Sequence, residues 1–90
     1  MGNAAVKIRI MPDSPNSDLK IMGEKAKKII EKNHGKIYSS ELELIAFGLK
    51  AIIITFSIKE EFEQDPLLYE LRNIKNVSSA EIIDFRRIGF

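Results

Sequence analysis

Few residues of this 90-residue chain have side chains that could carry out covalent chemistry, and their number and spacing argue against it. The sequence has no cysteine and a single histidine, His34. Without cysteine there is no thiolate metal site, thiol nucleophile or disulfide, and one histidine cannot build a multi-histidine metal site. Neighbouring carboxylates occur at Glu41 and Glu43 and within residues 60–63, in stretches that we expect to be exposed. We therefore predict no catalytic residue, no metal site and no cofactor.

Sites for phosphate or nucleic acid are also poorly supported. The five glycines are scattered, and none of their spacings matches a phosphate-binding loop. A sheet that binds single-stranded RNA needs aromatic side chains in its central strands, and the segments that we expect there contain only Phe56. Lysines are frequent from residue 25 to 32, but Glu24 and Glu31 stand among them, so we interpret this stretch as a solvated helix surface. The imidazole of His34 is expected to bond the last carbonyl groups of that helix.

Two segments remain as candidate contact sites. The segment 45–51, Ile-Ala-Phe-Gly-Leu-Lys-Ala, places Phe47 beside Gly48 where the chain is expected to reverse. Phe47 either projects as an apolar anchor for a partner or packs over the edge of the sheet, and the residues alone leave both open. Near the carboxyl end, Arg86 and Arg87 are adjacent in an expected strand and so point to opposite faces. They are either a free basic tail or cations that can enter a phosphate or metal site of a partner.

Length and charge limit the setting in which these segments act. Ninety residues suit one domain, residues 1–90, and 44% hydrophobic residues suffice for a modest core. The 14 basic and 13 acidic residues give a net charge of +1, which provides no overall attraction to nucleic acid or to an anionic membrane. No apolar run is long enough to span a bilayer, and Lys7 and Arg9 interrupt the first apolar stretch, unlike a secretory signal. Together with the lack of cysteine, this predicts a cytoplasmic protein.

Hydrophobic periodicity predicts four strands and two helices that must position these segments. Apolar and polar alternation or runs of β-branched residues indicate the strands, and stripes at helical spacing indicate the helices. In chain order they are a strand at 5–11, a helix at 18–33, strands at 36–43 and 49–58, a helix at 66–74 and a strand at 77–87. A helix over 41–50 is the alternative for one stretch, because Leu42, Ile45 and Leu49 also fit a helical period.

Capping residues set the expected ends of the helices. Ser17 or Asp18 supplies the N-cap oxygen of the first helix, and Gly35 ends that helix. Asp65 is expected to cap the second helix, with Pro66 at its first position.

This order of elements predicts an α+β fold of the ferredoxin-like type. Two helices bury their apolar stripes against one face of a four-stranded antiparallel sheet, and the other face stays open. Gly23, inside the first helix, indicates a close packing contact. Because this fold hosts many unrelated functions, a stand-alone RNA-binding domain and a small-ligand regulatory domain used as a dimer remain as alternatives.

Five motifs make the chain resemble the archaeal members of the elongation factor 1-beta family of guanine nucleotide exchange factors. The most specific is the segment 45–51, and the others are Ile8-Arg9-Ile10-Met11-Pro12-Asp13-Ser14-Pro15, Asp18-Leu19, residues 77–82 and Arg86-Arg87-Ile88-Gly89. The chain departs from the family at Leu44, where proline is common, and in the loop 59–64, which lacks the usual glycine.

The resemblance implies a function without covalent chemistry. Members promote GDP release from the GTPase elongation factor 1-alpha, so the chain is expected to be no enzyme but a cytoplasmic exchange factor, monomeric when free. Its partner would be that GTPase, GDP-bound or nucleotide-free, with no direct nucleic acid and no membrane. Phe47 would wedge against the GTPase, and Arg87 would bring its cation to the phosphate and magnesium site at the same interface, where eukaryotic relatives have a near-terminal lysine. The expected contact residues are Met11, Pro12, Phe47, Gly48, Lys50, Arg86 and Arg87.

Overall fold

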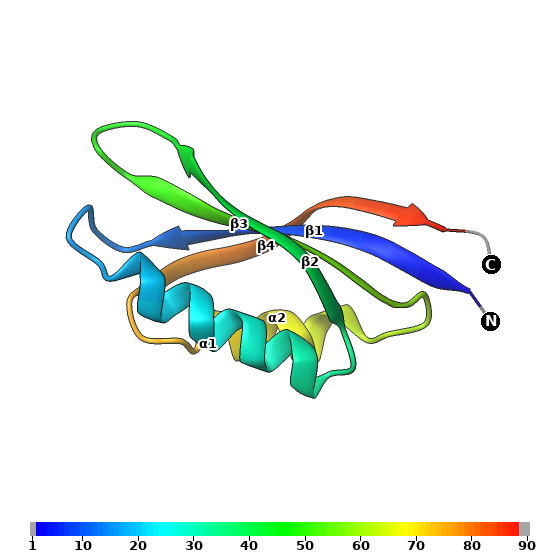
Figure 1. The fold of residues 1–90 in the computed structure, drawn as a ribbon. Coiled ribbons are helices and arrows are strands. Elements are labelled where there is room, and N and C mark those ends of the chain that lie inside the picture. The colour runs from blue at the N-terminus through cyan, green and yellow to red at the C-terminus, as the bar shows by residue number, and fades with distance from the viewer. Residues whose placement is uncertain (1, 89–90) are drawn as a thin grey trace.

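The structure, a computed structural model, describes residues 2–88 and contains the four strands and two helices in the predicted order (Figure 1). They are β1 (Asn3–Pro12), α1 (Leu19–Lys32), β2 (Lys36–Leu44), β3 (Lys50–Lys59), α2 (Gln64–Arg72) and β4 (Val77–Arg87). The strands form one antiparallel sheet in the order β2-β3-β1-β4, and both helices lie on one side of it. The ferredoxin-like arrangement is therefore confirmed. The alternative helix over 41–50 is wrong, because β2 and β3 stay paired up to Leu44 and Lys50.

The core lies between the sheet and the two helices. In β3, which is flanked by β2 and β1, the alternating residues Ile52, Ile54 and Phe56 are at most 1% exposed. On the helical side, the stripe of α1 buries Met22, Ala26 and Ile30 against these strands. The same periodicities of two and 3.6 residues that predicted the elements thus define the buried faces.

The carboxyl end of α1 is closed differently from the prediction. His34 takes a left-handed backbone conformation with φ of 71°, and the side-chain amide of Asn33, not the imidazole, donates a 2.8 Å hydrogen bond to the carbonyl of Ile29. The N–H of Gly35 donates to the carbonyl of Ile30 at 2.9 Å, which completes a Schellman-type end. Residue 35 must be glycine because there is no room for a side chain, and not because its backbone is left-handed. A Cβ at this position would lie 2.5 Å from Cγ2 of Ile30.

Three further predictions about the helices have mixed outcomes. Asp18 caps α1 as expected, since its Oδ1 accepts a 3.2 Å hydrogen bond from the N–H of Ile21. Gly23 marks no close approach, because a Cβ there would meet its nearest neighbour at an ordinary 3.9 Å. The N-cap of α2 is Glu63 and not Asp65, and the side chain of Glu63 makes no capping bond. Pro66 fits inside the first turn because the N–H groups there have no helical partner.

None of the helices in the described part of the chain combines the length and apolar character needed to cross a membrane.

Candidate functional site

The tip of the β2–β3 hairpin is a tight turn centred on Phe47 and Gly48. The N–H of Leu49 donates to the carbonyl of Ala46 at 2.9 Å, and the two residues between them both have positive φ, 54° for Phe47 and 79° for Gly48. Two consecutive left-handed residues are the requirement of a type I′ hairpin turn. Glycine adopts this conformation freely, whereas for phenylalanine it costs about 1–2 kcal/mol. A strained aromatic residue at the tip of a turn is a candidate for function.

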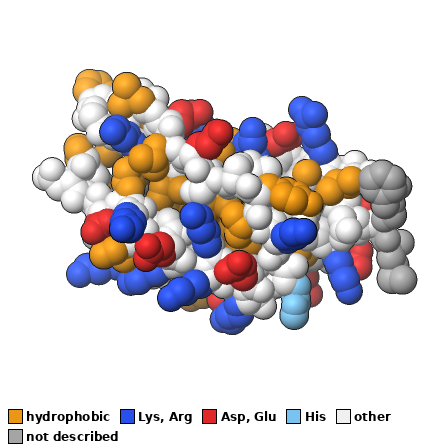
Figure 2. Space-filling model, in the orientation of Figure 1, with side chains coloured by type: hydrophobic (Ala, Val, Ile, Leu, Met, Phe, Trp, Pro, Cys, Tyr) orange, Lys and Arg blue, Asp and Glu red, His pale blue; other side chains and the backbone are white. Residues whose placement is uncertain are grey.

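The ring of Phe47 projects into solvent. Its exposed fraction is 96%, so the interpretation in which it packs over the sheet edge is wrong, and the role of the projecting ring as an anchor for a partner stays a prediction. The hairpin extends beyond the ends of the helices (Figure 1), which leaves Leu42 and Leu44 on its helix-facing side 57% and 69% exposed. Together with Ile45 these side chains form an apolar surface over the hairpin (Figure 2), the kind of surface that partners bind.

The end of β1 lies beside this tip. Pro12 is buried and Met11 half-buried, whereas Lys50 at the start of β3 is exposed. A cavity of about 230 Å³ between them is lined by Pro12, Lys50 and Gly48 together with residues of the loop after β1. Five predicted contact residues therefore gather at the hairpin end of the sheet, which we call the hairpin end. Pro12 supports it from inside, and Phe47, Gly48 and Lys50 are its exposed members.

Arg86 and Arg87 lie at the other end of the sheet, where β1 begins; we call it the terminal end. They pair in register with Ala5 and Ala4 of β1 and point to opposite faces, as predicted. The guanidinium of Arg86 lies 3.2 Å from the carboxylate of Asp84, and that of Arg87 lies 3.6 Å from the carboxylate of Glu60. Both arginines are exposed. Exposed ion pairs of this kind contribute little stability, so both cations are available to a partner.

The structure thus separates the predicted contact residues into two groups. Arg87 is level with Ala4, and the hairpin end is level with Pro12, eight residues further along β1, or about 27 Å at the rise of a strand. The molecule itself measures 41 Å along its longest axis. A partner that touches both groups must therefore span most of the length of the sheet.

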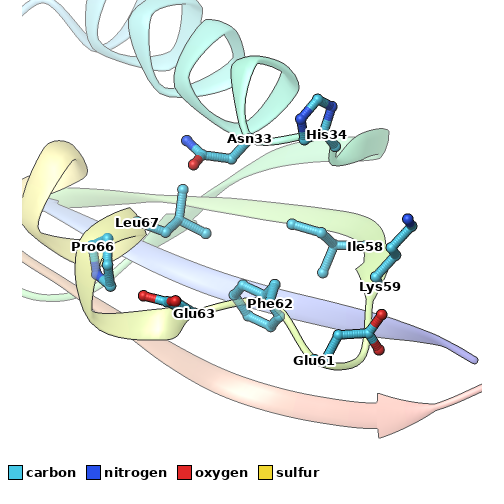
Figure 3. Close-up of a pocket in the computed structure, with 9 residues that line it drawn as sticks. All are labelled: Asn33, His34, Ile58, Lys59, Glu61, Phe62, Glu63, Pro66 and Leu67. Atoms are coloured by element: carbon cyan, nitrogen blue, oxygen red, sulfur yellow. The ribbon is translucent and has the colours of Figure 1, made fainter. Parts of the chain in front are cut away.

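A cavity of about 520 Å³ opens at the terminal end between the helices and β3 (Figure 3). Ile58, Phe62 and Leu67 point into it, and charged side chains stand at its rim. Phe62 lies in the acidic loop that was expected to be wholly solvated, yet it packs against the core and stacks on Phe85 with ring centroids 6.3 Å apart. Sequence reasoning missed Phe62, although a lone aromatic residue among acids was the signal for it.

The central strands β1 and β3 offer no aromatic platform for RNA on the open face of the sheet. Phe56, the expected candidate, is fully buried under the helices. On the open face the guanidinium of Arg9 is paired with the carboxylate of Glu81, and Lys7 is opposite Asp84 in the register of β1 and β4. Charges of both signs on this face give it little net attraction for phosphate groups.

The described residues contain no site for acid–base or metal chemistry. Residues 2–88 include no cluster of three or more histidine or acidic side chains that could hold a metal ion, and no polar or charged residue among them is buried. The hydrogen bond from Lys32, aided by one from Asn33, lowers the pKa of Glu70, which keeps that surface carboxylate ionised.

Comparison with known proteins identifies the family of the chain and proteins with a similar fold. Residues 5–88 match the family described as the EF-1 guanine nucleotide exchange domain. The chain is 42% identical over 77 residues to elongation factor 1-beta of Nanoarchaeum equitans, a match covering 84% of this chain and 94% of that protein. It is 38% identical over 92 residues to elongation factor 1-beta of Methanosarcina barkeri, covering 98% and 100%. Among solved structures, the ACT domain from GTP pyrophosphokinase of Chlorobium tepidum is similar, with a TM-score of 0.65 over 90% of this chain and 99% of that one. At 18% identity, this last likeness concerns the fold alone.

Proposed function

Because the chain belongs to the family of EF-1 guanine nucleotide exchange domains, it is a guanine nucleotide exchange factor for elongation factor 1-alpha, and we propose that it holds this GTPase at both ends of its sheet. The hairpin end anchors the complex through Phe47, and the terminal end brings Arg86 and Arg87 towards the bound nucleotide. The observation that carries this assignment of sites is the 96% exposure of Phe47 in a strained turn.

The proposed mechanism is displacement of charge without covalent chemistry. GDP is held to a GTPase largely through its phosphates and a magnesium ion. An arginine cation that enters this site competes with the groups that bind the phosphate oxygens, and it repels the magnesium ion. The contacts of GDP through its phosphates and through the magnesium ion therefore both weaken. By linkage, an exchange factor that lowers the affinity for GDP is itself bound less tightly by the GDP-loaded GTPase than by the nucleotide-free one. Both forms are therefore partners, and the nucleotide-free form is the tighter one.

The separation of the two ends divides the work between them. Contacts at the hairpin end are about 27 Å from those at the terminal end, so an anchor at Phe47 can stay bound while the arginines act at the nucleotide site. We propose that residues 1–90 form one exchange domain, that it acts as a monomer when free, and that it works in the cytoplasm, where translation takes place.

Release of labelled GDP tests this proposal. Elongation factor 1-alpha loaded with fluorescent GDP is mixed with excess unlabelled GDP and increasing amounts of the protein, and release is followed by the loss of fluorescence. We expect a saturable acceleration, and release that stays at the intrinsic rate with saturating protein would refute the function. Arg87→Ala is expected to lower the maximal release rate by more than it raises the half-saturating concentration. Arg87→Lys keeps the charge and is expected to recover part of the rate.

A further inference from the structure

Two lysines of α1 line a groove that the acidic residues of this helix do not reach. At about 100° per residue, Glu24 and Glu31 lie roughly 100° and 120° around the axis from Lys25, and about 40° and 60° from Lys28, on the side of Lys28 that faces away from Lys25. Neither acidic residue lines the groove between α1 and the segment that joins α2 to β4, whereas Lys25 and Lys28 both do. The interpretation of this stretch as a solvated helix surface agrees with the exposure of these side chains, and the groove brings two of the lysines next to apolar side chains.

The groove consists of two adjoining hollows of about 490 and 270 Å³ that share Lys25, Ile74 and Lys75. Ile21 and Ile29 of α1 add further apolar side chains to its lining, and Ile21 is half exposed. Along α1 the groove runs from Ile21 to Ile29, which is about 12 Å at 1.5 Å per residue. This length accommodates three or four residues of an extended peptide.

The cations of this groove form no ion pair with any carboxylate that the structure describes. Within residues 2–88 the ion pairs of α1 are limited to that of Lys32 with Glu70, at 2.9 Å, and Lys25, Lys28 and Lys75 take part in none. The two carboxylates at the groove already have partners, since Asp18 caps α1 and Glu70 binds Lys32. Lysine and arginine side chains stand among acidic ones along the side of the molecule on which α1 lies (Figure 2).

We propose that this groove, which we call the lysine groove, binds an acidic peptide segment of a partner protein with aliphatic side chains between its carboxylates. The lysines at the rim pair with the carboxylates, and the aliphatic side chains contact the isoleucines. The site lies on the helical side of the molecule, outside the two groups of contact residues assigned to the GTPase, so it gives the exchange factor a second, independent attachment.

The lining of the lysine groove favours a peptide over RNA. No aromatic side chain lines either hollow, so bases have no ring on which to stack. The cations are lysines without a guanidinium fork, and the apolar isoleucines between them match nothing in a phosphate backbone. An acidic peptide with aliphatic residues satisfies both the charges and the apolar lining.

Nuclear magnetic resonance titration of the ¹⁵N-labelled protein tests the proposal. The probe is a short synthetic peptide in which aspartate and leucine alternate, and the reference is the same peptide with asparagine in place of aspartate. We expect the acidic peptide to shift the backbone amides of residues 21–32 and 73–76, with an affinity that falls as salt is raised. The asparagine peptide is expected to bind at least tenfold more weakly.

Two matched double variants locate the site on one side of α1. Lys25→Glu with Lys28→Glu is expected to weaken the acidic peptide about tenfold or more, since each lost surface ion pair contributes up to about 1 kcal/mol and each reversal adds repulsion. Lys20→Glu with Lys27→Glu makes the same change of charge on the other side of the helix and is expected to leave the affinity within about twofold. Thermal unfolding verifies that both variants are folded.

Several results would overturn the lysine groove as a peptide site. They are equal weakening by both double variants, amide shifts elsewhere in the protein, no shift at millimolar peptide, or tighter binding of oligouridylate to the same amides, which would assign the groove to RNA. GDP release from elongation factor 1-alpha is measured on the same variants. Because the lysine groove lies outside the contact residues assigned to the GTPase, unchanged release together with absent peptide binding would refute this inference alone and leave the exchange function standing.

Discussion

Removal of the Phe47 ring should weaken binding to elongation factor 1-alpha without lowering the stability of the fold. The ring is 96% exposed, so its loss removes no core contact, and its backbone φ of 54° carries a cost of about 1–2 kcal/mol that glycine avoids. We therefore expect Phe47→Gly to leave the free energy of unfolding unchanged or to raise it by up to about 1 kcal/mol. Phe47→Ala keeps the strain and is expected to unfold like the wild type.

The effect on the complex should be in the opposite direction. Full burial of a phenylalanine side chain at an interface is worth about 1.5–3 kcal/mol, which corresponds to a dissociation constant roughly 10- to 150-fold higher without the ring. Both variants should show this loss when titrated into nucleotide-free elongation factor 1-alpha in a calorimeter. Urea unfolding of the same samples gives the stability, so a variant that is at least as stable as the wild type yet binds more weakly is the expected outcome.

Tyr69 provides the matched control for this experiment. It is another exposed aromatic residue, 69% accessible on α2, and it lies outside the hairpin end. Tyr69→Ala is expected to leave the dissociation constant within about twofold of the wild type. The reasoning fails if the Phe47 variants also bind within twofold, or if Tyr69→Ala weakens the complex as much as they do.

Three further predictions concern the stability of the fold. Gly23→Ala should raise the free energy of unfolding by about 1 kcal/mol, because the helix gains propensity and the added Cβ has room; a loss in urea unfolding would show that the contact is tighter than observed. Gly35→Ala should lower it by about 1–3 kcal/mol, since its Cβ would lie 2.5 Å from Cγ2 of Ile30, and equal stability would contradict that clash. The pKa of Glu70 is lowered by the hydrogen bond from Lys32, so its contribution is present above the ordinary glutamate pKa and is lost as pH falls through the lowered one. Glu70→Gln should therefore flatten the acidic part of the stability–pH profile, and an unchanged profile would refute this role.

Local patterns were sufficient to predict the fold. Alternating apolar residues such as Ile8 and Ile10 in β1 follow the two-residue period of a strand, and the stripe of α1 follows the 3.6-residue period of a helix. Both periods can be recognised in the sequence alone. The helix ends were less predictable: His34 accepts a left-handed conformation that glycine usually takes, and Gly35 is needed because of a side chain elsewhere in the turn. Such steric requirements appear only when the packed neighbours are known.

The residues of the candidate site could be predicted from the sequence, but their positions relative to one another could not. The exposure of Phe47 depends on how far the hairpin extends beyond the helices, which no local pattern reports. The separation of Phe47 from Arg87 follows from the strand order, because β4 runs antiparallel to β1 and ends where β1 begins. That Lys25 and Lys28 line a groove and Glu24 does not could likewise be seen only once the helix was placed beside α2.

The start of β1 and the end of β4 are joined by a hydrogen bond from the N–H of Ile88 to the carbonyl of Asn3, 2.8 Å long. Because Asn3 and Ile88 are in contact, a short flexible peptide can link the start of β1 to the end of β4, with a new opening of the chain in the loop 13–17. Such a circular permutant keeps every strand pairing, but it places Arg86 and Arg87 in the middle of a continuous chain. It would therefore show whether the fixed place of the arginines on the sheet edge is sufficient for their action.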